Sequence, residues 1–237
     1  MAALFILNAL AFIAYFLESI FGFGGTVIFL GAGGFFFDFK FLIVISIYMA
    51  LVASLTIIIQ SWRHIAWKHI GILMLLTLPG LIVGTLMMGQ LGSGTLLKVF
   101  AVFLILYGVQ GIFFPQLVLH HFIGKAFVMM GGFIHGVFTT GGPFVLMGYR
   151  ENFAGKTELR ASMAVFFVLA NIWRIAQEGI FQGGEAVKTI IEYWWTAIPI
   201  IAAVIAGYFI HLGLPETLFR RAMTIGLMSV GVVFLLK

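Results

Sequence analysis

Long apolar runs, separated by short polar segments, make up most of this 237-residue chain. Examples are ISIYMALVASLTIII at 45–59 and FAVFLILYGVQGIFF at 100–114, which lack the polar–apolar alternation of membrane β-strands. A bilayer core of about 30 Å takes about 20 helical residues. On that length, the pattern predicts membrane helices near 3–20, 41–60, 70–89, 95–113, 158–178, 189–210 and 216–236.

Two further apolar stretches, 21–37 and 122–148, are interrupted by paired glycines. When FLESIFGFGGTVIFLG at 16–31 is placed over FIHGVFTTGGPFVLMG at 133–148, five positions are identical, including both glycines of each pair. We interpret 1–113 and 122–237 as two internal repeats, although apolar segments also resemble each other through composition alone. The predicted fold class is therefore an all-α polytopic membrane helix bundle of about seven to nine transmembrane segments.

Each glycine-broken stretch either crosses the membrane once or folds back as a re-entrant hairpin of two half-helices. Single crossings would make the repeats parallel, whereas hairpins would make them inverted. The positive-inside rule mildly favours the hairpin, with the cytoplasmic face carrying the larger set of basic residues. That set is Arg63, Lys68, Lys125, Arg150, Lys156, Arg160, Arg220 and Arg221, against Lys40, Lys98, Arg174, Lys188 and Lys237 on the other face.

The composition excludes several classes of function. Hydrophobic residues make up 62% of the chain and charged residues 9%, which are too few charges for the surface of a water-soluble domain. We therefore expect 1–237 to be one transmembrane domain. The net charge of +5 is spread over short loops, so nucleic acid is not an expected partner. Cysteine is absent, and we find no metal-ligand spacing, nucleotide loop or catalytic triad. We therefore expect no enzyme activity, metal or cofactor. The first residues lack the features of a signal peptide and are read as the first helix.

The paired glycines are the best candidates for a binding site. Backbone that leaves its helix at membrane depth is tolerated where it lines a cavity or meets a ligand, and the helix that resumes offers free N–H groups to an anion. We favour this reading over simple helix packing, which we expect of Gly31, Gly33, Gly84 and Gly108. The substrate-binding candidates are Gly22, Gly24, Gly25, Thr26, Thr139, Thr140, Gly141, Gly142, Asn171 and Arg174.

Ionisable residues within the apolar stretches are functional candidates because their burial is costly. Glu18 and His135 occupy equivalent repeat positions and are candidates for proton coupling, with a structural hydrogen bond as the equal alternative. Asn171 and Arg174 share one helix face. Arg174 either meets an anion or extends to the membrane interface, and we favour the interface. Arg160 is read as a helix-start charge that sets topology.

At these residues the sequence resembles the TauE/SafE family of sulfite exporters. The resemblance is carried by FGFGG at 21–25, HGVFTTGG at 135–142, WRHIAWKHI at 62–70 and KTELRASMAVFFVLANIWR at 156–174. It implies a multi-pass protein of the bacterial cytoplasmic (inner) membrane that exports small anions, chiefly sulfite or organosulfur anions such as sulfoacetate. It also implies a link to the proton-motive force.

The leading hypothesis is a secondary transporter whose substrate sits between the two glycine breaks near the midplane. An anion channel with the same site is the alternative, and a membrane enzyme or non-transport membrane subunit is a third reading. The expected partners are a small anion and the lipid bilayer, and a homo-oligomer is left open.

Overall fold

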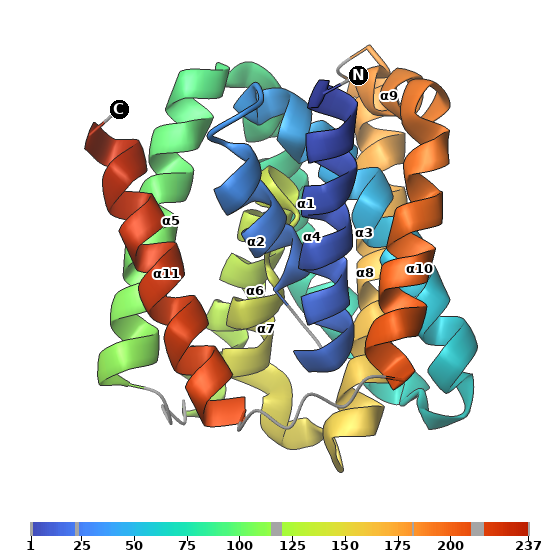
Figure 1. Ribbon diagram of the computed structural model, residues 1–237. Coiled ribbons are helices and arrows are strands. Elements are labelled where there is room, and N and C mark those ends of the chain that lie inside the picture. Colours follow the sequence, from blue (N-terminus) through green and yellow to red (C-terminus); the bar gives the residue numbers. More distant parts are fainter. Residues whose placement is uncertain (1, 22–23, 115–119, 182, 210–215, 237) are drawn as a thin grey trace.

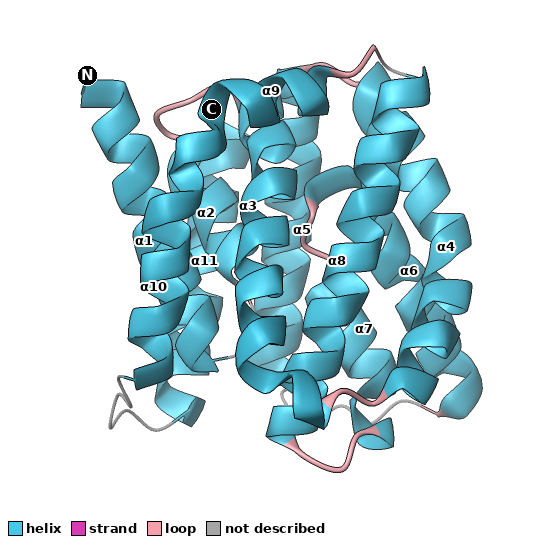
Figure 2. Ribbon diagram, turned by 90° about the vertical axis from the view of Figure 1, so that its right-hand side faces the viewer, coloured by secondary structure: helices cyan, strands magenta, loops and turns pink. Residues whose placement is uncertain are grey.

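The computed structural model describes residues 2–21, 24–114, 120–181, 183–209 and 216–236, which form helices and short connections in a single bundle (Figures 1 and 2). Both described ends of the chain lie at the same end of the bundle (Figure 1). The helices are α1 (Ala2–Phe21), α2 (Gly25–Gly33), α3 (Phe39–Ser61), α4 (Trp67–Gln90), α5 (Ser93–Phe113), α6 (His121–Phe138), α7 (Gly142–Tyr149), α8 (Lys156–Phe181), α9 (Glu185–Tyr193), α10 (Ala197–Phe209) and α11 (Glu216–Leu236).

The all-α prediction is confirmed, and the predicted helices match observed ones within a few residues. Six helical stretches of the described chain are long and apolar enough to cross a membrane, and two shorter apolar helices accompany them. One difference is that the stretch expected at 189–210 begins earlier, because α9 and α10 follow each other through a single 3₁₀ turn at Trp194–Thr196. The two shorter apolar stretches are Phe122–Phe138 within α6 and Thr224–Leu236 within α11.

Polar side chains fix where α3 and α5 begin. Asp38 caps α3 by accepting a hydrogen bond from the Phe41 N–H at 3.0 Å. The Ser93 hydroxyl accepts N–H groups of Phe39 and Lys40 at 2.9 and 3.1 Å, which ties the two helix starts together. Burial alone would raise the pKa of Asp38, but hydrogen bonds from Ser93 and the backbone, with the charge of Lys40, hold that pKa below its usual value.

Both glycine-broken stretches fold back on themselves. In the second, a Cβ on Gly131 would meet Gly141 and Val145, and one on Gly124 would meet Gly148, so α7 runs antiparallel along α6. In the first, Gly25 lies against Ala14 and Glu18, which places α2 back along α1. Both stretches therefore fold back as the hairpin alternative expected, but α1 is not a half-helix, because Ala2–Ile20 is itself long and apolar enough to cross a membrane. The first hairpin starts at the end of the bundle that holds both termini, and the second starts at the opposite end (Figure 1).

Helices from the two halves of the chain pack against each other in matched pairs. α1 packs on α10 and α6 on α4, while α3 packs on α8 and α5 on α11. Small residues permit the closest approaches, since a Cβ on Gly84 of α4 would run into the α6 backbone at Phe133 and Gly136. The packing role predicted for Gly84 is therefore confirmed. Gly31, Gly33 and Gly108 likewise lie against side chains of other helices.

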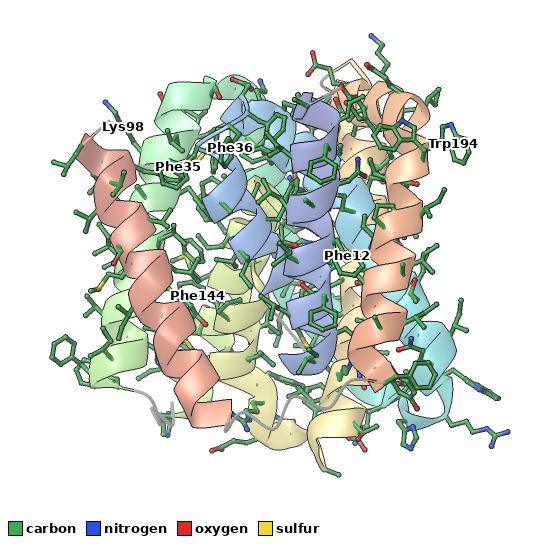
Figure 3. The ribbon with its side chains drawn as sticks, in the orientation of Figure 1. Phe12, Phe35, Phe36, Lys98, Phe144 and Trp194 are labelled. Atoms are coloured by element: carbon green, nitrogen blue, oxygen red, sulfur yellow. The ribbon has the colours of Figure 1, made fainter. Side chains whose placement is uncertain are left out.

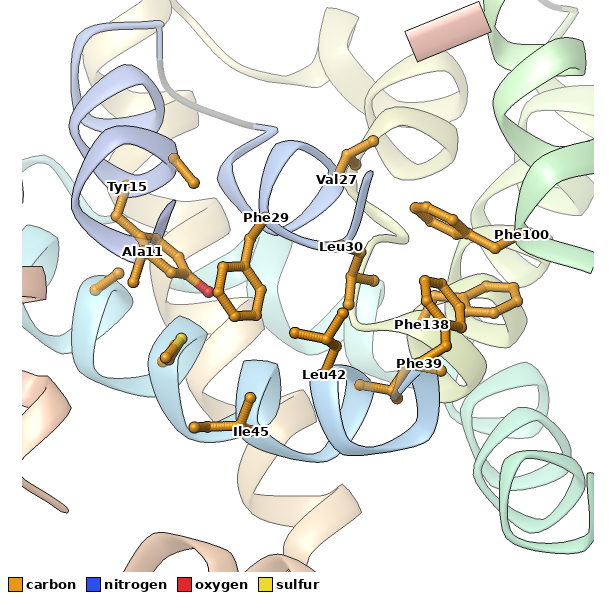
Figure 4. Packing of buried hydrophobic residues seen from close by; sticks show 14 of the residues in the cluster. Ala11, Tyr15, Val27, Phe29, Leu30, Phe39, Leu42, Ile45, Phe100 and Phe138 are labelled. Carbon is orange, nitrogen blue, oxygen red and sulfur yellow. The ribbon is translucent and has the colours of Figure 1, made fainter. Parts of the chain in front are cut away.

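The largest buried cluster surrounds the first hairpin and the start of α3. Figure 4 shows Phe39, Phe100 and Phe138 gathered beside Leu30 and Leu42, while Tyr15 points from α1 toward α3. Around this core, exposed apolar side chains cover the bundle's flanks, as expected where lipid is the solvent. Lys98 and Trp194 lie at the same end as the termini (Figure 3). Both residue types are common where a helix bundle meets the membrane interface.

Candidate anion site at the second helix break

The second break interrupts the backbone between α6 and α7. Thr139 ends α6 in the left-handed conformation with φ 61°, which is unusual for a residue other than glycine. α7 begins at Gly142 with Pro143 in its first turn, where a proline needs no hydrogen-bond donor. Thr139, Thr140 and Gly142 are all buried. The N–H groups of the first turn of a helix lack intrahelical partners, so this break presents donors inside the bundle.

Arg174 of α8 is fully buried beside this break. Its exposed fraction is 0%, and its Nη1 donates a hydrogen bond to the Thr139 hydroxyl. Its Nε and Nη2 have no hydrogen-bond partner among the described residues. The interface position that we favoured for Arg174 is therefore wrong. Its side chain turns inward because α3, α4 and α9 cover α8, and the Thr139 hydroxyl at the end of α6 accepts its hydrogen bond.

Glu178, one helical turn after Arg174 on α8, is the described carboxylate that interacts electrostatically with it. The two oxygens of Glu178, however, accept the N–H groups of Glu185 and Ala186 at 2.6 and 3.1 Å. Glu178 therefore ties α8 to the start of α9. The guanidinium of Arg174 keeps two N–H donors that an oxyanion could accept from.

Asn171 and His135 form a second polar pair at the same place. His135 Nε2 lies 3.2 Å from Asn171 Oδ1, so this nitrogen carries the proton and donates. The imidazole stacks on Phe167 with ring centroids 5.4 Å apart. Asn171 Nδ2 and the Thr140 hydroxyl have no hydrogen-bond partner among the described residues. The break thus gathers further buried donors that the described part of the chain does not use.

Ser46 of α3 completes the cluster and was missed from the sequence. Its hydroxyl donates to Thr139 Oγ1 at 3.1 Å, and it is fully buried. A small polar residue in the otherwise apolar run at 41–53 was the available signal.

The first break has a different arrangement. Gly24 precedes α2 in the left-handed conformation, and the N–H of Gly25 donates to Glu18 Oε2 at 2.7 Å. Thr26 is buried and lies 3.5 Å from the hydroxyl of Tyr15. Gly22 lies outside the described residues. The N-terminus of α2 is therefore capped by a carboxylate of the chain itself, whereas His135 at the equivalent position bonds to Asn171.

Arg160 of α8 approaches the first break. Its Nη2 donates to the Ser19 hydroxyl at 3.2 Å, so its contacts go beyond the topological role that we expected. Arg160 and Arg174 are fourteen positions apart on α8, which corresponds to about 21 Å of helix rise. The residues beside the first break and those of the second break therefore contact different parts of α8, through Ser19 and Thr139 respectively.

No group of three or more His, Asp or Glu side chains suited to a metal ion was found within the described residues. Arginine, amide and hydroxyl donors predominate at the second break, and such a set favours an oxyanion over a cation.

Comparison with known proteins identifies the chain's relatives. The model of the family described as "Sulfite exporter TauE/SafE" matches residues 7–234. A protein of Comamonas testosteroni, named "Probable inner membrane transporter protein TsaS", is 27% identical over 183 residues, covering 72% of this chain and 73% of the relative. No solved structure was found to match.

Proposed function

Because the chain belongs to the TauE/SafE sulfite exporter family, and is thus a multi-pass membrane transporter and not an enzyme, we propose that it exports a small anion across the inner membrane. The proposed substrate is sulfite or an organosulfur anion such as sulfoacetate. The family match supports the class of substrate, and the buried donors of the second break support its negative charge.

Arg174 is the observation that carries this proposal. A fully buried guanidinium with two donor nitrogens that lack partners among the described residues is costly, because its charge has been taken out of water. An oxyanion that accepts from Nε and Nη2 together would offset that cost with two charge-assisted hydrogen bonds. We place the substrate at the second break, with Thr140, Asn171 and the start of α7 as further donors.

The matched packing of the two halves supports a duplicated unit with inverted repeats, 1–113 and 122–237. Transporters built in this way move one repeat against the other around a site formed by broken helices. The loops at 61–67 and 149–156 lie together at the end opposite the termini. Their basic residues support an orientation in which this end faces the cytoplasm. Glu18 and His135, both buried beside the breaks, are the groups proposed for proton linkage.

Tracer flux tests the proposal. Purified protein in proteoliposomes is given labelled sulfite with and without an imposed proton gradient, and unlabelled sulfoacetate and sulfate serve as competitors. Uphill movement that follows the gradient is expected, with stronger competition from sulfoacetate, a member of the proposed substrate class, than from sulfate. Downhill movement alone, whatever the gradient, would identify an anion channel. Absence of flux for every sulfur oxyanion tried would refute the proposed substrate class.

His135→Gln and Glu18→Gln separate transport from coupling. If either residue carries the coupling proton, its amide variant keeps downhill sulfite exchange but loses accumulation against a concentration gradient. Equal loss of both activities would contradict a coupling role.

A further inference from the structure

The N-terminus of α2 is satisfied by a carboxylate that the chain carries two turns earlier. Glu18 Oε2 accepts the Gly25 N–H at 2.7 Å, and the Glu18 side chain is only 9% exposed. A Cβ on Gly25 would lie 2.5 Å from the same oxygen, so glycine at this position leaves the space that the carboxylate fills. A negative group at this position also meets the positive end of the helix dipole.

The surroundings of this carboxylate resemble those of the second break. Arg160 acts electrostatically on Glu18 and donates to the neighbouring Ser19 hydroxyl at 3.2 Å. Its Nε has no hydrogen-bond partner among the described residues. Each break therefore combines a helix N-terminus, a hydroxyl and an arginine from α8. The difference is the residue before the break, which is Glu18 in the first half and His135 in the second.

We propose that the first helix break is a second anion site, and that the chain's own Glu18 carboxylate occupies it. One half of the protein then carries a tethered anion, while the other half leaves the corresponding position open for a free one. This role of Glu18 does not depend on which anion is transported. A proton taken up by Glu18 would neutralise the tethered anion. Protonation would thereby change the charge at the first break, which connects Glu18 with the coupling of transport to protons.

Glu18→Ala tests the proposal by chemical rescue. The substitution removes one methylene and the carboxylate, which together correspond to an acetate ion. Thermal unfolding of the full-length protein in detergent is followed at rising acetate concentrations, with chloride at matched ionic strength as the salt control. We expect Glu18→Ala to unfold several degrees below wild type, and acetate to restore at least half of that loss. Wild type should not respond, because its site is filled.

Glu18→Gln is the matched control. Its amide fills the same volume and its oxygen can still accept from Gly25, so acetate should not raise its unfolding temperature. A Glu18→Ala variant as stable as wild type would overturn the proposal. So would acetate raising all three proteins equally. If Glu18→Ala folds only when acetate is present during solubilisation, the proposal is supported. If Glu18→Ala fails to fold with and without acetate while Glu18→Gln folds, the proposal is contradicted. These readouts do not involve sulfite, so they stand whether or not sulfite is the substrate.

Discussion

Replacing Arg174 with glutamine should weaken anion binding without destabilising the empty protein. The substitution keeps much of the side-chain volume but removes the charge and the two N–H donors that lack described partners. It also removes the hydrogen bond to Thr139. The two consequences, one for the bound state and one for the empty state, have different sizes and can be measured separately.

The loss in the bound state follows from the two donors. A hydrogen bond to a charged group contributes about 1.5–3 kcal/mol, so two such bonds to a bound anion contribute about 3 kcal/mol at the lower limit. At about 1.4 kcal/mol for each tenfold change, Arg174→Gln should raise the apparent Kd for sulfite by about a hundredfold. Lysine keeps the charge but not the planar fork, so Arg174→Lys should fall between wild type and Arg174→Gln.

The empty state should respond in the opposite direction. The fully buried charge of Arg174 has no close carboxylate partner among the described residues, and such a charge costs several kcal/mol. Losing the charged hydrogen bond to Thr139 costs about 1.5–3 kcal/mol, which does not exceed the cost of the buried charge. The unfolding temperature of Arg174→Gln without substrate should therefore equal or exceed that of wild type.

Initial rates of labelled sulfite uptake over a range of concentrations measure the first effect, and thermal unfolding in detergent measures the second. Arg63→Gln, which removes an exposed arginine from the 61–67 loop, is the control and should change neither. The reasoning fails if Arg174→Gln transports sulfite with an unchanged KM. It also fails if the variant unfolds well below wild type, because Arg174 would then be a structural residue.

Three further predictions address the hairpins and the site. Gly84→Ala should lower the unfolding temperature because its Cβ meets the α6 backbone. Gly71→Ala on the same helix, where the added Cβ meets open space, should leave the unfolding temperature unchanged or slightly higher. Equal effects would contradict the packing argument. Asp38→Ala should lower the free energy of unfolding by about 1 kcal/mol at pH 7 through loss of a helix cap. Because the pKa of Asp38 is lowered in the folded protein, this difference should disappear as the pH falls through that pKa. A difference that persists in acid would refute the role of the charge. Asn171→Leu should free His135 Nε2 and raise the sulfite KM at least about tenfold, the equivalent of one hydrogen bond to a charged group. An unchanged KM in uptake assays would exclude Asn171 from the site.

The sequence was sufficient for the helices and the breaks because their signals are local. Apolar runs of about 20 residues predict membrane helices wherever they occur. The glycine pairs at Gly24–Gly25 and Gly141–Gly142 stand where the helices stop and resume. The fold-back itself was left open, because it depends on glycines spread along α6, such as Gly131, that let α7 approach closely.

The composition of the site depended on contacts that no local pattern reveals. Whether Arg174 faces lipid headgroups or the interior is decided by the packing of α3 on α8 and by the polar groups that receive it. Ser46 lies in an apolar run, and only the folded structure brings it to Thr139. Glu18 was a candidate for proton coupling or for a structural hydrogen bond, but its capping of α2 could be seen only from the position of Gly25 in space.

The central claim is that a small oxyanion binds at the second break beside Arg174. A crystal structure of the protein with selenite, the selenium analogue of sulfite, tests it most directly through anomalous scattering. The account predicts an anomalous peak beside Arg174, next to Thr140 and the start of α7, at a position that brings the selenite oxygens within hydrogen-bond distance of Nε and Nη2. It predicts no peak at the Glu18-capped start of α2. A peak at the first break, or no peak beside Arg174 at concentrations that support transport, would contradict it.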